Sequence, residues 1–369
     1  MQSRQQLASW VLREGMSLSE AARLAGVSRP TASLWVERAR TEDIAQLSER
    51  SRAPYTAPAR TAQEIESAVV ALKQAHPYWG AKKLHAVLWP AEGSAAVCVR
   101  TVDRLLKRNG LVRRRDRPED ASETLRFERA GCNELWQMDY KGLGAGAQQL
   151  SYRTLSILDD HSRFCIALEA LERSAGVQGP LMWSAVWAAM EEFGLPERFL
   201  CDNGDGFNLR ASPGPTRFQA NCWLLGIKTT HGRPYHPQTQ GKVERFHGTL
   251  QREMGQALAP PQVASAQAGY AQFRRRYNGE RPHEGIGLRT PGTLYMPSPR
   301  PRPVRLPEHV PADQAVTRKV NRIGRIRFRG QSYVAGKGLA AEYAEVRRDE
   351  ADGHIVCRFV GVEFTPTKV

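Results

Sequence analysis

The spacing of apolar residues changes along the chain and predicts three kinds of structure. Over residues 5–40, and again from residue 64, apolar positions recur three and four residues apart, which is typical of amphipathic helices. From residue 130 short apolar runs predict strands, with a helical run at 175–194 between them. After residue 315 apolar and polar residues alternate between glycine turns. We therefore expect a multidomain chain with N-terminal all-α helix-turn-helix modules, a central α/β core and a C-terminal small β-barrel.

The first helical stretch has the pattern of a helix-turn-helix. Ser17 or Ser19 can cap one helix, and Ser28 can cap a second helix that is expected to carry Leu34 and Trp35 inward. The second helix would place four polar side chains near DNA: Arg29, Thr31, Ser33 and Arg38. The alternative is a plain helical hairpin without a role in DNA binding.

A second helical unit follows a linker that is rich in Pro, Ser and Arg. Two helices are predicted on either side of His76–Pro77, and a third within residues 94–115, where Asp103 is the only acid. On this third helix four basic residues are spaced to share one face: Arg100, Arg104, Lys107 and Arg108. A solvated face is the alternative, but this density of one charge favours contacts with phosphates.

Shifts in composition predict the limits of the domains. In chain order we expect a helix-turn-helix domain (1–46), a linker (47–63), a second helical DNA-binding domain (64–116), another linker (117–129), the α/β core (130–296), an extended Pro-rich linker (297–314) and a basic β-barrel (315–369). In the last of these, alternation predicts that Ile326 and Phe328 are buried, opposite three arginines on one strand face: Arg325, Arg327 and Arg329.

The balance of charge narrows the choice of partner. The chain has 53 Lys and Arg against 38 Asp and Glu, a net charge of +15, which favours a polyanion. An anionic membrane is the competing partner, but no lipidation signal is found and the most apolar run, 181–190, is too short to span a bilayer. The N-terminus lacks the apolar run of a signal peptide, and the six cysteines form no C-x-x-C pair, so a cytosolic protein with reduced thiols is expected.

Three carboxylates in the middle domain stand where chemistry is expected. Asp139 lies in an apolar strand, Asp202 follows another, and Glu244 opens a helix after the turn-forming run 236–241. A carboxylate in an apolar strand is costly unless it is paired or bound to a metal. Two strand carboxylates and one helix carboxylate can converge on two divalent cations, the arrangement used for in-line phosphoryl displacement, and Mg²⁺ prefers such oxygen ligands. Taken singly, Asp202 can merely end a strand in a turn, and Glu244 can merely complement the helix dipole.

Five segments between residues 133 and 295 carry a resemblance to a known family: LWQMDYKG, LSILDDHSRF, FLCDNGDGF, LLGIKTTHGRPYHPQTQGKVERFHGTLQRE and YNGERPHEGIGLRTPGTLY. As an ordered set they resemble bacterial insertion-sequence transposases with a retroviral-integrase-type catalytic core. The resemblance implies an RNase H-like fold whose Asp-Asp-Glu triad of catalytic residues and metal ligands falls on Asp139, Asp202 and Glu244. The 42 positions from Asp202 to Glu244 exceed the usual spacing of this subgroup, and we place the excess in a loop at 208–218.

The resemblance also implies an activity and its partners. It implies a DDE-type transposase that cuts at element ends and transfers the 3′-OH strand into target DNA, with Mg²⁺ or Mn²⁺ as cofactor, two ions per active site. The implied partners are double-stranded DNA of the element ends and the target, and further copies of the chain, at least a dimer on DNA. No membrane partner is implied, and the location is the bacterial cytoplasm, associated with the nucleoid.

Residues around the triad receive roles of their own. Gln240 and His247 share a helix face with Glu244 and are expected to orient the site or contact DNA, whereas Lys242 and Arg245 flank that face and are expected to hold phosphates. By resemblance, the neighbouring pair Asp159 and Asp160 belongs to the scaffold. Two residues of the YNGERPH segment, Arg281 and His283, can equally serve the substrate or close the core by packing.

Two other functions compete with transposition. A simple nuclease of the same fold would only hydrolyse DNA and would need no modules for recognising element ends, of which two are predicted here. A regulator derived from an inactive transposase would bind DNA without chemistry and would have lost a carboxylate, yet Asp139, Asp202 and Glu244 are all present.

Overall fold

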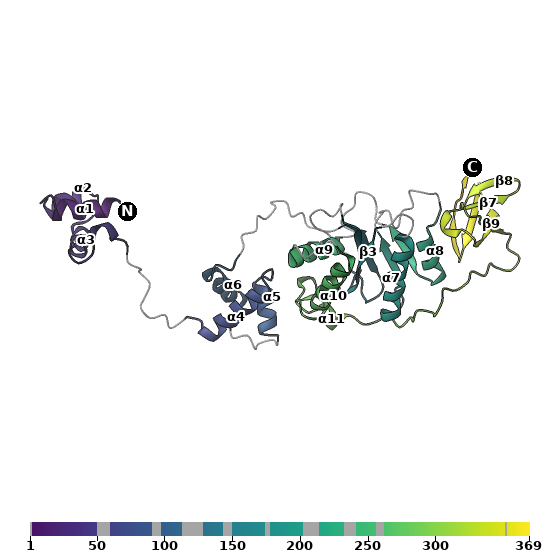
Figure 1. Ribbon diagram of the computed structural model, residues 1–369, viewed down its shortest axis with the longest axis horizontal. Coiled ribbons are helices and arrows are strands. Elements are labelled where there is room, and N and C mark those ends of the chain that lie inside the picture. The colour runs from purple at the N-terminus through teal and green to yellow at the C-terminus, as the bar shows by residue number, and fades with distance from the viewer. Residues whose placement is uncertain are drawn as a thin grey trace. The chain divides into compact units, whose positions relative to one another are not determined.

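The chain folds into two compact units, residues 1–62 and 63–369, in a computed structural model (Figure 1). The structure describes residues 2–49, 60–90, 97–112, 128–142, 150–173, 178–201, 214–231, 241–255, 262–350 and 353–369. Within these ranges, no helix has both the length and the apolar character needed to cross a membrane.

The first unit is a small helical module. Its helices are α1 (Gln2–Leu12), α2 (Leu18–Leu24) and α3 (Arg29–Thr41), followed by the 3-10 turn η1 (Ile44–Gln46). The Ser17 hydroxyl accepts from the amide of Glu20 at the start of α2, and the Ser28 hydroxyl accepts from the amide of Thr31 at the start of α3. Both serines therefore act as helix caps, as the sequence predicts.

The inward face of α3 differs in part from the prediction. Four residues at helical spacing are buried: Ala32, Trp35, Val36 and Ala39. Trp35 thus points inward as expected, but Leu34 is 57% exposed, so the prediction for Leu34 is wrong. The reason is helical phase, because Leu34 falls between the inward positions 32 and 35 and is turned away from the stripe that they define.

The second unit begins with another set of three helices. These are α4 (Gln63–Ala75), α5 (Ala81–Leu88) and α6 (Val99–Arg108), and the break between α4 and α5 falls at His76–Pro77 as predicted. Glu66 on α4 is buried and accepts hydrogen bonds from Arg108 and, at 2.8 Å, from the side chain of Asn109. This pairing joins the first helix of the set to the last.

A five-stranded sheet forms the centre of the second unit. Its strands are β1 (Trp136–Lys141), β2 (Tyr152–Asp159), β3 (Cys165–Glu172), β4 (Arg198–Cys201) and β5 (Lys228–His231), in the order β3-β2-β1-β4-β5. β1, β2 and β3 pair antiparallel, whereas β4 runs parallel to both β1 and β5. The apolar runs predict the first four strands. β5 escapes prediction because its sequence, KTTH, contains no apolar residue.

Helices cover both faces of this sheet (Figure 1). α7 (Gln178–Phe193) and α8 (Arg217–Leu224) share an apolar core with one face, and α9 (Gly241–Met254) and α10 (Val263–Gly279) share a second core with the other. The short elements η5 (Glu284–Ile286) and α11 (Pro291–Leu294) follow. This layered arrangement agrees with the predicted α/β core.

The C-terminal strands form two small sheets instead of one closed barrel. Their bounds are β6 (Thr317–Lys319), β7 (Arg325–Phe328), β8 (Gln331–Val334), β9 (Tyr343–Arg348), β10 (Ile355–Phe359), β11 (Val362–Phe364) and β12 (Thr367–Lys368), with the turn η6 (Lys337–Leu339) after β8. The sheet orders are β11-β10-β9-β6 and β12-β8-β7. The predicted strands are present, but the sheets of the described residues do not close into a barrel.

The hairpin β7–β8 also corrects the predicted face of three arginines. Ile326 and Phe328 are buried as expected, and Arg325 and Arg327 lie on the opposite face of β7. Arg329 is not on that face, because it and Gly330 form the connecting turn with φ angles of 49° and 78°. Two successive residues with positive φ are typical of a tight two-residue hairpin turn.

The β module, residues 315–369, shares its core with a helix of the α/β domain. Ala220 of α8 is fully buried among the apolar side chains of the β module. Thr216 caps α8, which begins at Arg217, so the end of the predicted loop 208–218 is helical, and residues 208–213 lie outside the described ranges. The backbone of Gly338 packs so closely on this helix start that a Cβ atom there would lie 2.1 Å from the carbonyl carbon of Thr216.

The Pro-rich segment 297–314 contains no helix or strand and is packed against the α/β domain. The Arg300 guanidinium donates to the carbonyl oxygens of Pro196 and Leu225 at 3.1 and 2.9 Å. Arg302 lies over the Trp187 ring at 4.3 Å and pairs with Glu191 of α7 at 3.1 Å. The segment therefore follows the surface of the domain before it enters the β module.

The contact at Gly338 provides a test of this shared core. In Gly338→Ala, the added methyl group meets backbone that cannot move aside cheaply, so we expect the free energy of unfolding of the 63–369 unit to fall by about 1–3 kcal/mol. The measurement is urea unfolding of the full chain followed by Trp fluorescence. Gly279→Ala is the control, because a Cβ atom at Gly279 meets nothing within 4 Å. Equal stability of the two variants would contradict close docking at Gly338.

Candidate active site

Asp139 is a buried carboxylate on the central strand of the sheet. Side chains alternate along β1, so Trp136, Met138 and Tyr140 enter the core beneath α7 and α8, while Asp139 points to the opposite face. Asp139 is 3% exposed, and it lies directly across from Ser156 of β2. An ionised side chain at such a place needs compensating partners or a bound cation.

α9 supplies the groups that face Asp139. The helix is held to the sheet by three buried apolar residues: Val243, Phe246 and Leu250. His247 is buried beside them, with Nδ1 3.4 Å from Asp139 Oδ2 and Nε2 3.0 Å from the Ser156 hydroxyl oxygen. The predicted orienting role of His247 is thus supported by a contact with one of the predicted metal ligands.

Glu244 lies one helical turn before His247. Residues three apart share a face of a helix, so α9 brings Glu244 to the same side of the sheet as Asp139. The Glu244 side chain is exposed, and it stands in the first turn of the helix. An exposed carboxylate at this place is accessible to a cation.

The third predicted ligand, Asp202, lies outside the described residues. The strand that precedes it in sequence is described, and there Cys201 is paired with Met138 in parallel register. These two residues immediately precede Asp202 and Asp139 in the chain. The first half of β1 and the last three residues of β4 therefore run side by side up to the residue before each aspartate.

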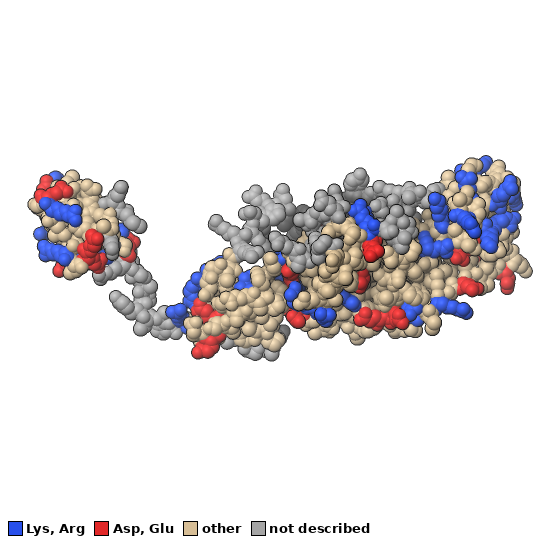
Figure 2. Space-filling view, in the orientation of Figure 1, with Lys and Arg blue, Asp and Glu red and all other residues tan. Residues whose placement is uncertain are grey.

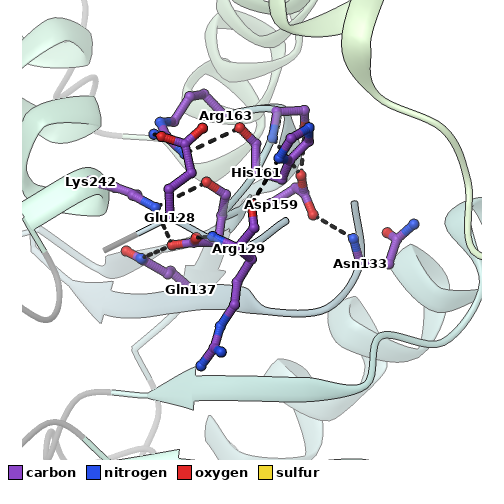
Figure 3. A network of polar contacts seen from close by, with 10 residues as sticks. Glu128, Arg129, Asn133, Gln137, Asp159, His161, Arg163 and Lys242 are labelled. Atoms are coloured by element: carbon purple, nitrogen blue, oxygen red, sulfur yellow. Dashed lines mark hydrogen bonds and ion pairs between the residues drawn. The ribbon is translucent and has the colours of Figure 1, made fainter. Parts of the chain in front are cut away.

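The neighbouring Asp160 has a different set of partners. Three of them, Arg129, Gln137 and Lys242, are labelled in Figure 3 within a network of polar contacts. The Asp160 carboxylate accepts from the amide of Arg129 at 2.8 Å and from the side chain of Gln137 at 2.7 Å. The ammonium group of Lys242 lies 2.6 Å from the carboxylate and also donates to the Asp160 carbonyl oxygen at 3.1 Å. Burial lowers the pKa of Lys242, and the hydrogen bond to Asp160 opposes that shift.

Asp159 holds the turn that follows β2. Its carboxylate accepts from the amide of Asn133 at 2.7 Å, from the amide of Ser162 at 2.8 Å and from the Ser162 hydroxyl at 2.6 Å. Burial raises the pKa of Asp159, while these hydrogen bonds oppose the rise. Both Asp159 and Asp160 therefore have protein partners, as expected of scaffold carboxylates.

The described residues are suited to a hard divalent cation. Asp139 and Glu244 offer oxygen ligands, the type that Mg²⁺ and Mn²⁺ prefer, and His247 packs behind Asp139. In the part of the chain that the structure describes, no three His, Cys, Asp or Glu side chains gather into a metal-binding group. Since Asp202 is outside that part, the predicted triad is only partly represented there.

The predicted DNA contacts of the first unit fall into two groups. Arg29, Thr31 and Ser33 are exposed on α3. Arg38 is instead engaged within the module, where it pairs with Glu42 at 2.8 Å, donates to a backbone carbonyl and lies 4.7 Å from the centre of the Trp35 ring.

In the second helical set, Arg100 and Arg104 are exposed on α6, while Lys107 pairs with Asp103 at 2.8 Å. Arg108 pairs with the buried Glu66. The remaining predicted contacts belong to the α/β domain and the β module. In the α/β domain, Arg245 is exposed on α9, Lys242 is bound to Asp160, and Gln240 is outside the described residues. Three arginines lie on the β module: Arg325, Arg327 and Arg329. Figure 2 shows Lys and Arg side chains gathered over that module.

The YNGERPH segment packs against the core. Arg281 is buried, donates to Glu253 at 2.8 Å and lies over the Tyr277 ring, so for Arg281 the packing alternative holds. Burial and the positive charge of Arg281 lower the pKa of His283 to about 3. Three further cations act in the same direction: Arg163, Lys83 and Arg245.

Some site residues were missed by sequence reasoning. Ser156, the hydrogen-bond partner of His247, looks in the sequence like any small polar residue of a strand. Gln137 was also missed, although it is two residues before Asp139 in an apolar run and therefore shares its face. The one available signal for Gln137 was that a polar residue two positions from a catalytic candidate lies on the same face of the strand.

Family models match most of the described core. Residues 130–237 and 225–291 each match an integrase core domain, and residues 31–106 match a homeodomain-like domain. An uncharacterized 39.2 kDa protein of insertion element IS476 from Xanthomonas euvesicatoria is 28% identical over 239 residues, covering 64% of this chain and 65% of that protein. The resemblance drawn from the sequence is confirmed: the chain carries an integrase core domain and is related to insertion-element proteins.

Retroviral proteins are also similar over shorter stretches. The Gag-Pro-Pol polyprotein of simian retrovirus SRV-2 is 36% identical over 126 residues, covering 33% of this chain and 6% of the polyprotein. The chain thus spans less than two thirds of the length of the curated relatives named here. Among solved structures, the catalytic core domain of BIV integrase has 24% sequence identity and a TM-score of 0.33, covering 44% of this chain and 93% of that chain.

The environment of His283 makes stability depend on pH. The unfolded chain binds a proton near pH 6.5, but the folded chain binds it only near pH 3, so the folded state loses stability as the pH falls from above 6.5 toward 3. For each pH unit of this decrease, His283 lowers the free energy of unfolding by at most about 1.4 kcal/mol. We expect His283→Gln to flatten the dependence between pH 7 and 4.5 in urea unfolding. His354→Gln, a histidine of the β module, is the control, and parallel pH profiles for His283→Gln and wild type would contradict the expectation.

Proposed function

We propose that the chain is a DNA transposase that cuts at the ends of a mobile element and transfers the resulting 3′-OH strand into target DNA. One observation carries the proposal: α9 contacts Asp139 through His247 and presents Glu244 one turn earlier. The pairing of Cys201 with Met138 supports Asp202 as the third ligand. The integrase core domain and the relationship to insertion-element proteins agree with this assignment.

Asp139, Asp202 and Glu244 would hold Mg²⁺ or Mn²⁺, two ions per site. Such ions stabilise the attacking and leaving oxygens of an in-line phosphoryl displacement. The chain's own residues prepare the site: His247 fixes the orientation of the Asp139 carboxylate, and Arg245, exposed beside Glu244, is available to a DNA phosphate. The same arrangement serves a hydrolytic cut and a strand transfer, since both are attacks of an oxygen on phosphorus.

The partner is double-stranded DNA, bound by several parts of one chain. The homeodomain-like match supports recognition of element ends by the helical modules, with Arg29, Thr31 and Ser33 as the exposed candidates on α3. The basic β module would contact the DNA backbone with little sequence preference. Because two element ends must be joined in one reaction, we propose at least a dimer on DNA. Association with the nucleoid stays a prediction.

Replacement of each ligand tests the chemistry. In Asp139→Asn, Asp202→Asn and Glu244→Gln, cutting and strand joining should fall by more than about 100-fold, because a metal ligand is lost while the side-chain shape is kept. The measurement uses the full chain, labelled element-end DNA and Mn²⁺, with 3′-end cuts and joined products separated on a denaturing gel. DNA binding is measured in parallel and should be unchanged. Glu280→Gln, an exposed carboxylate at the end of α10, is the matched control.

The outcomes separate the proposal from its rivals. Wild-type protein that cuts without joining is a nuclease, and protein that binds element ends but never cuts is a regulator. If one of the three ligand variants stays as active as the Glu280→Gln control, that residue is not a ligand.

The basic strand face gives a second test, which concerns DNA affinity. If Arg325 and Arg327 each contact one phosphate, replacing both by Ala should make the slope of log affinity against log salt less negative by about 1.8. The measurement is fluorescence anisotropy with a duplex of random sequence at several salt concentrations. Arg347→Ala is the control, because Arg347 is already paired with Glu363 at 3.1 Å. If the double variant has the same salt slope as Arg347→Ala, Arg325 and Arg327 do not contact DNA phosphates.

A further inference from the structure

Asp160 contacts both elements that carry described members of the predicted triad. On β1 it accepts from Gln137, which precedes Asp139 by two residues and shares its face of the strand. On α9 it pairs with Lys242, which precedes Glu244 by two residues. One carboxylate therefore joins β1 to the start of α9, with a contact to each element beside the residue that the proposed chemistry requires.

The surroundings make this link specific. Asp160 is 4% exposed and the Lys242 side chain is 18% exposed, so both charges are largely removed from water. A buried ion pair adds little net stability, but separating its partners leaves a buried charge uncompensated. Any position of the α9 start that moved Lys242 away from Asp160 would therefore be costly. The contact also provides an explanation of Lys242 that differs from the predicted phosphate contact, since its ammonium group already has two oxygen partners on Asp160.

The start of α9 is the part of the helix that needs such a contact. The first amide groups of a helix have no carbonyl acceptor within the helix, so its first turn is held more weakly than the turns that follow. Glu244 stands in this turn, whereas the later turns are fixed by Phe246 and Leu250 in the core and by His247 against Asp139. Val243 in this first turn is also buried, in an apolar core whose other members lie on β2, β3, α9 and α10. The Lys242–Asp160 pair adds a polar connection from the same turn through Gln137 to β1.

We propose that Asp160 is a positioning residue of the active site: through Gln137 and Lys242 it fixes the start of α9 against β1 and thereby sets Glu244 relative to Asp139. This inference rests on the proposed function, because it assigns a role toward the same metal-binding carboxylates. The carboxylate of the adjacent Asp159 instead accepts from Asn133, just before β1, and from Ser162, just after β2, and neither of these residues belongs to α9.

The first test measures metal binding without relying on activity. Mn²⁺ is titrated by calorimetry into the full chain, in wild type, Asp160→Asn, Lys242→Met and the double variant. Each single change should weaken Mn²⁺ binding about 10–100-fold, the usual effect of removing a group that orients a metal ligand. The double variant should be no weaker than the single variants, because both changes break one contact. Lys242→Arg should recover part of the affinity, since it keeps the positive charge.

Asp159→Asn is the matched control, as it removes an adjacent buried carboxylate that does not contact α9. We expect it to lower the melting temperature while leaving the Mn²⁺ affinity within about threefold of wild type. If it weakens Mn²⁺ binding as much as Asp160→Asn does, Asp160 acts only through general stability, and the positioning role is overturned. Unchanged Mn²⁺ affinity in folded Asp160→Asn and Lys242→Met would overturn it as well.

A second measurement reports on α9 directly and does not depend on a metal. Hydrogen exchange of the amides from Val243 to His247 should be faster in Asp160→Asn and Lys242→Met than in wild type, but not in Asp159→Asn. Unchanged exchange in the first two variants would contradict the link.

The failures of the two proposals are distinguishable. If wild type binds Mn²⁺ and the binding is lost in Asp139→Asn and Glu244→Gln, the metal site stands, whatever the Asp160 variants do. If wild type binds no Mn²⁺ through these carboxylates, with or without duplex DNA, the proposed function fails and the role of Asp160 fails with it.

Discussion

The alternation of side chains along β1 is the constraint on which the site depends. β1 is the central strand of the sheet, and its apolar residues, Trp136, Met138 and Tyr140, are buried beneath α7 and α8. A strand that is fixed in this way has no freedom to change its register by one residue, because every side chain would move to the wrong face. Gln137 and Asp139 are therefore forced onto the α9 face, where a polar residue must find a partner. The burial of the apolar residues of β1 thus determines that Gln137 and Asp139 face α9.

Three carboxylates are buried close together around β1 and the end of β2. Asp139, Asp159 and Asp160 are each nearly inaccessible to water, yet each has a contact that compensates for its burial: His247 for Asp139, Ser162 for Asp159 and Lys242 for Asp160. Compensation by protein groups leaves no charge for a ligand to satisfy, and this is the case for Asp159 and Asp160. Asp139 differs from them in facing α9, the helix that places His247 3.4 Å from it and also carries the exposed Glu244.

Sequence patterns predict the parts of this structure that depend on local spacing. Capping at Ser28, the break at His76–Pro77 and four of the five strands of the central sheet all follow from turn residues and apolar runs. Asp139 was singled out by its place in an apolar strand and Glu244 by its place at a helix start, the resemblance then implied a triad, and the structure brings their elements together. What sequence reasoning lacked were contacts between segments far apart in the chain, such as Asp160 with Lys242, since one sequence has no signal for a partner 82 positions away. The predictions for Leu34 and Arg329 were wrong for local reasons. Leu34 has the wrong helical phase to face inward, and Arg329 lies in a hairpin turn, and periodicity alone resolves neither.

The extra length predicted between Asp202 and Glu244 ends at the surface on which the β module docks. Gly214 and Thr216 fall within the predicted loop 208–218, and both meet the β module. Gly214 has a φ of 87°, and a Cβ atom there would lie 2.3 Å from the carbonyl oxygen of Ala335, so only glycine allows this approach. α8 then contributes Ala220 to the same core. The described end of the predicted loop and the helix that follows it are therefore in contact with the basic β module.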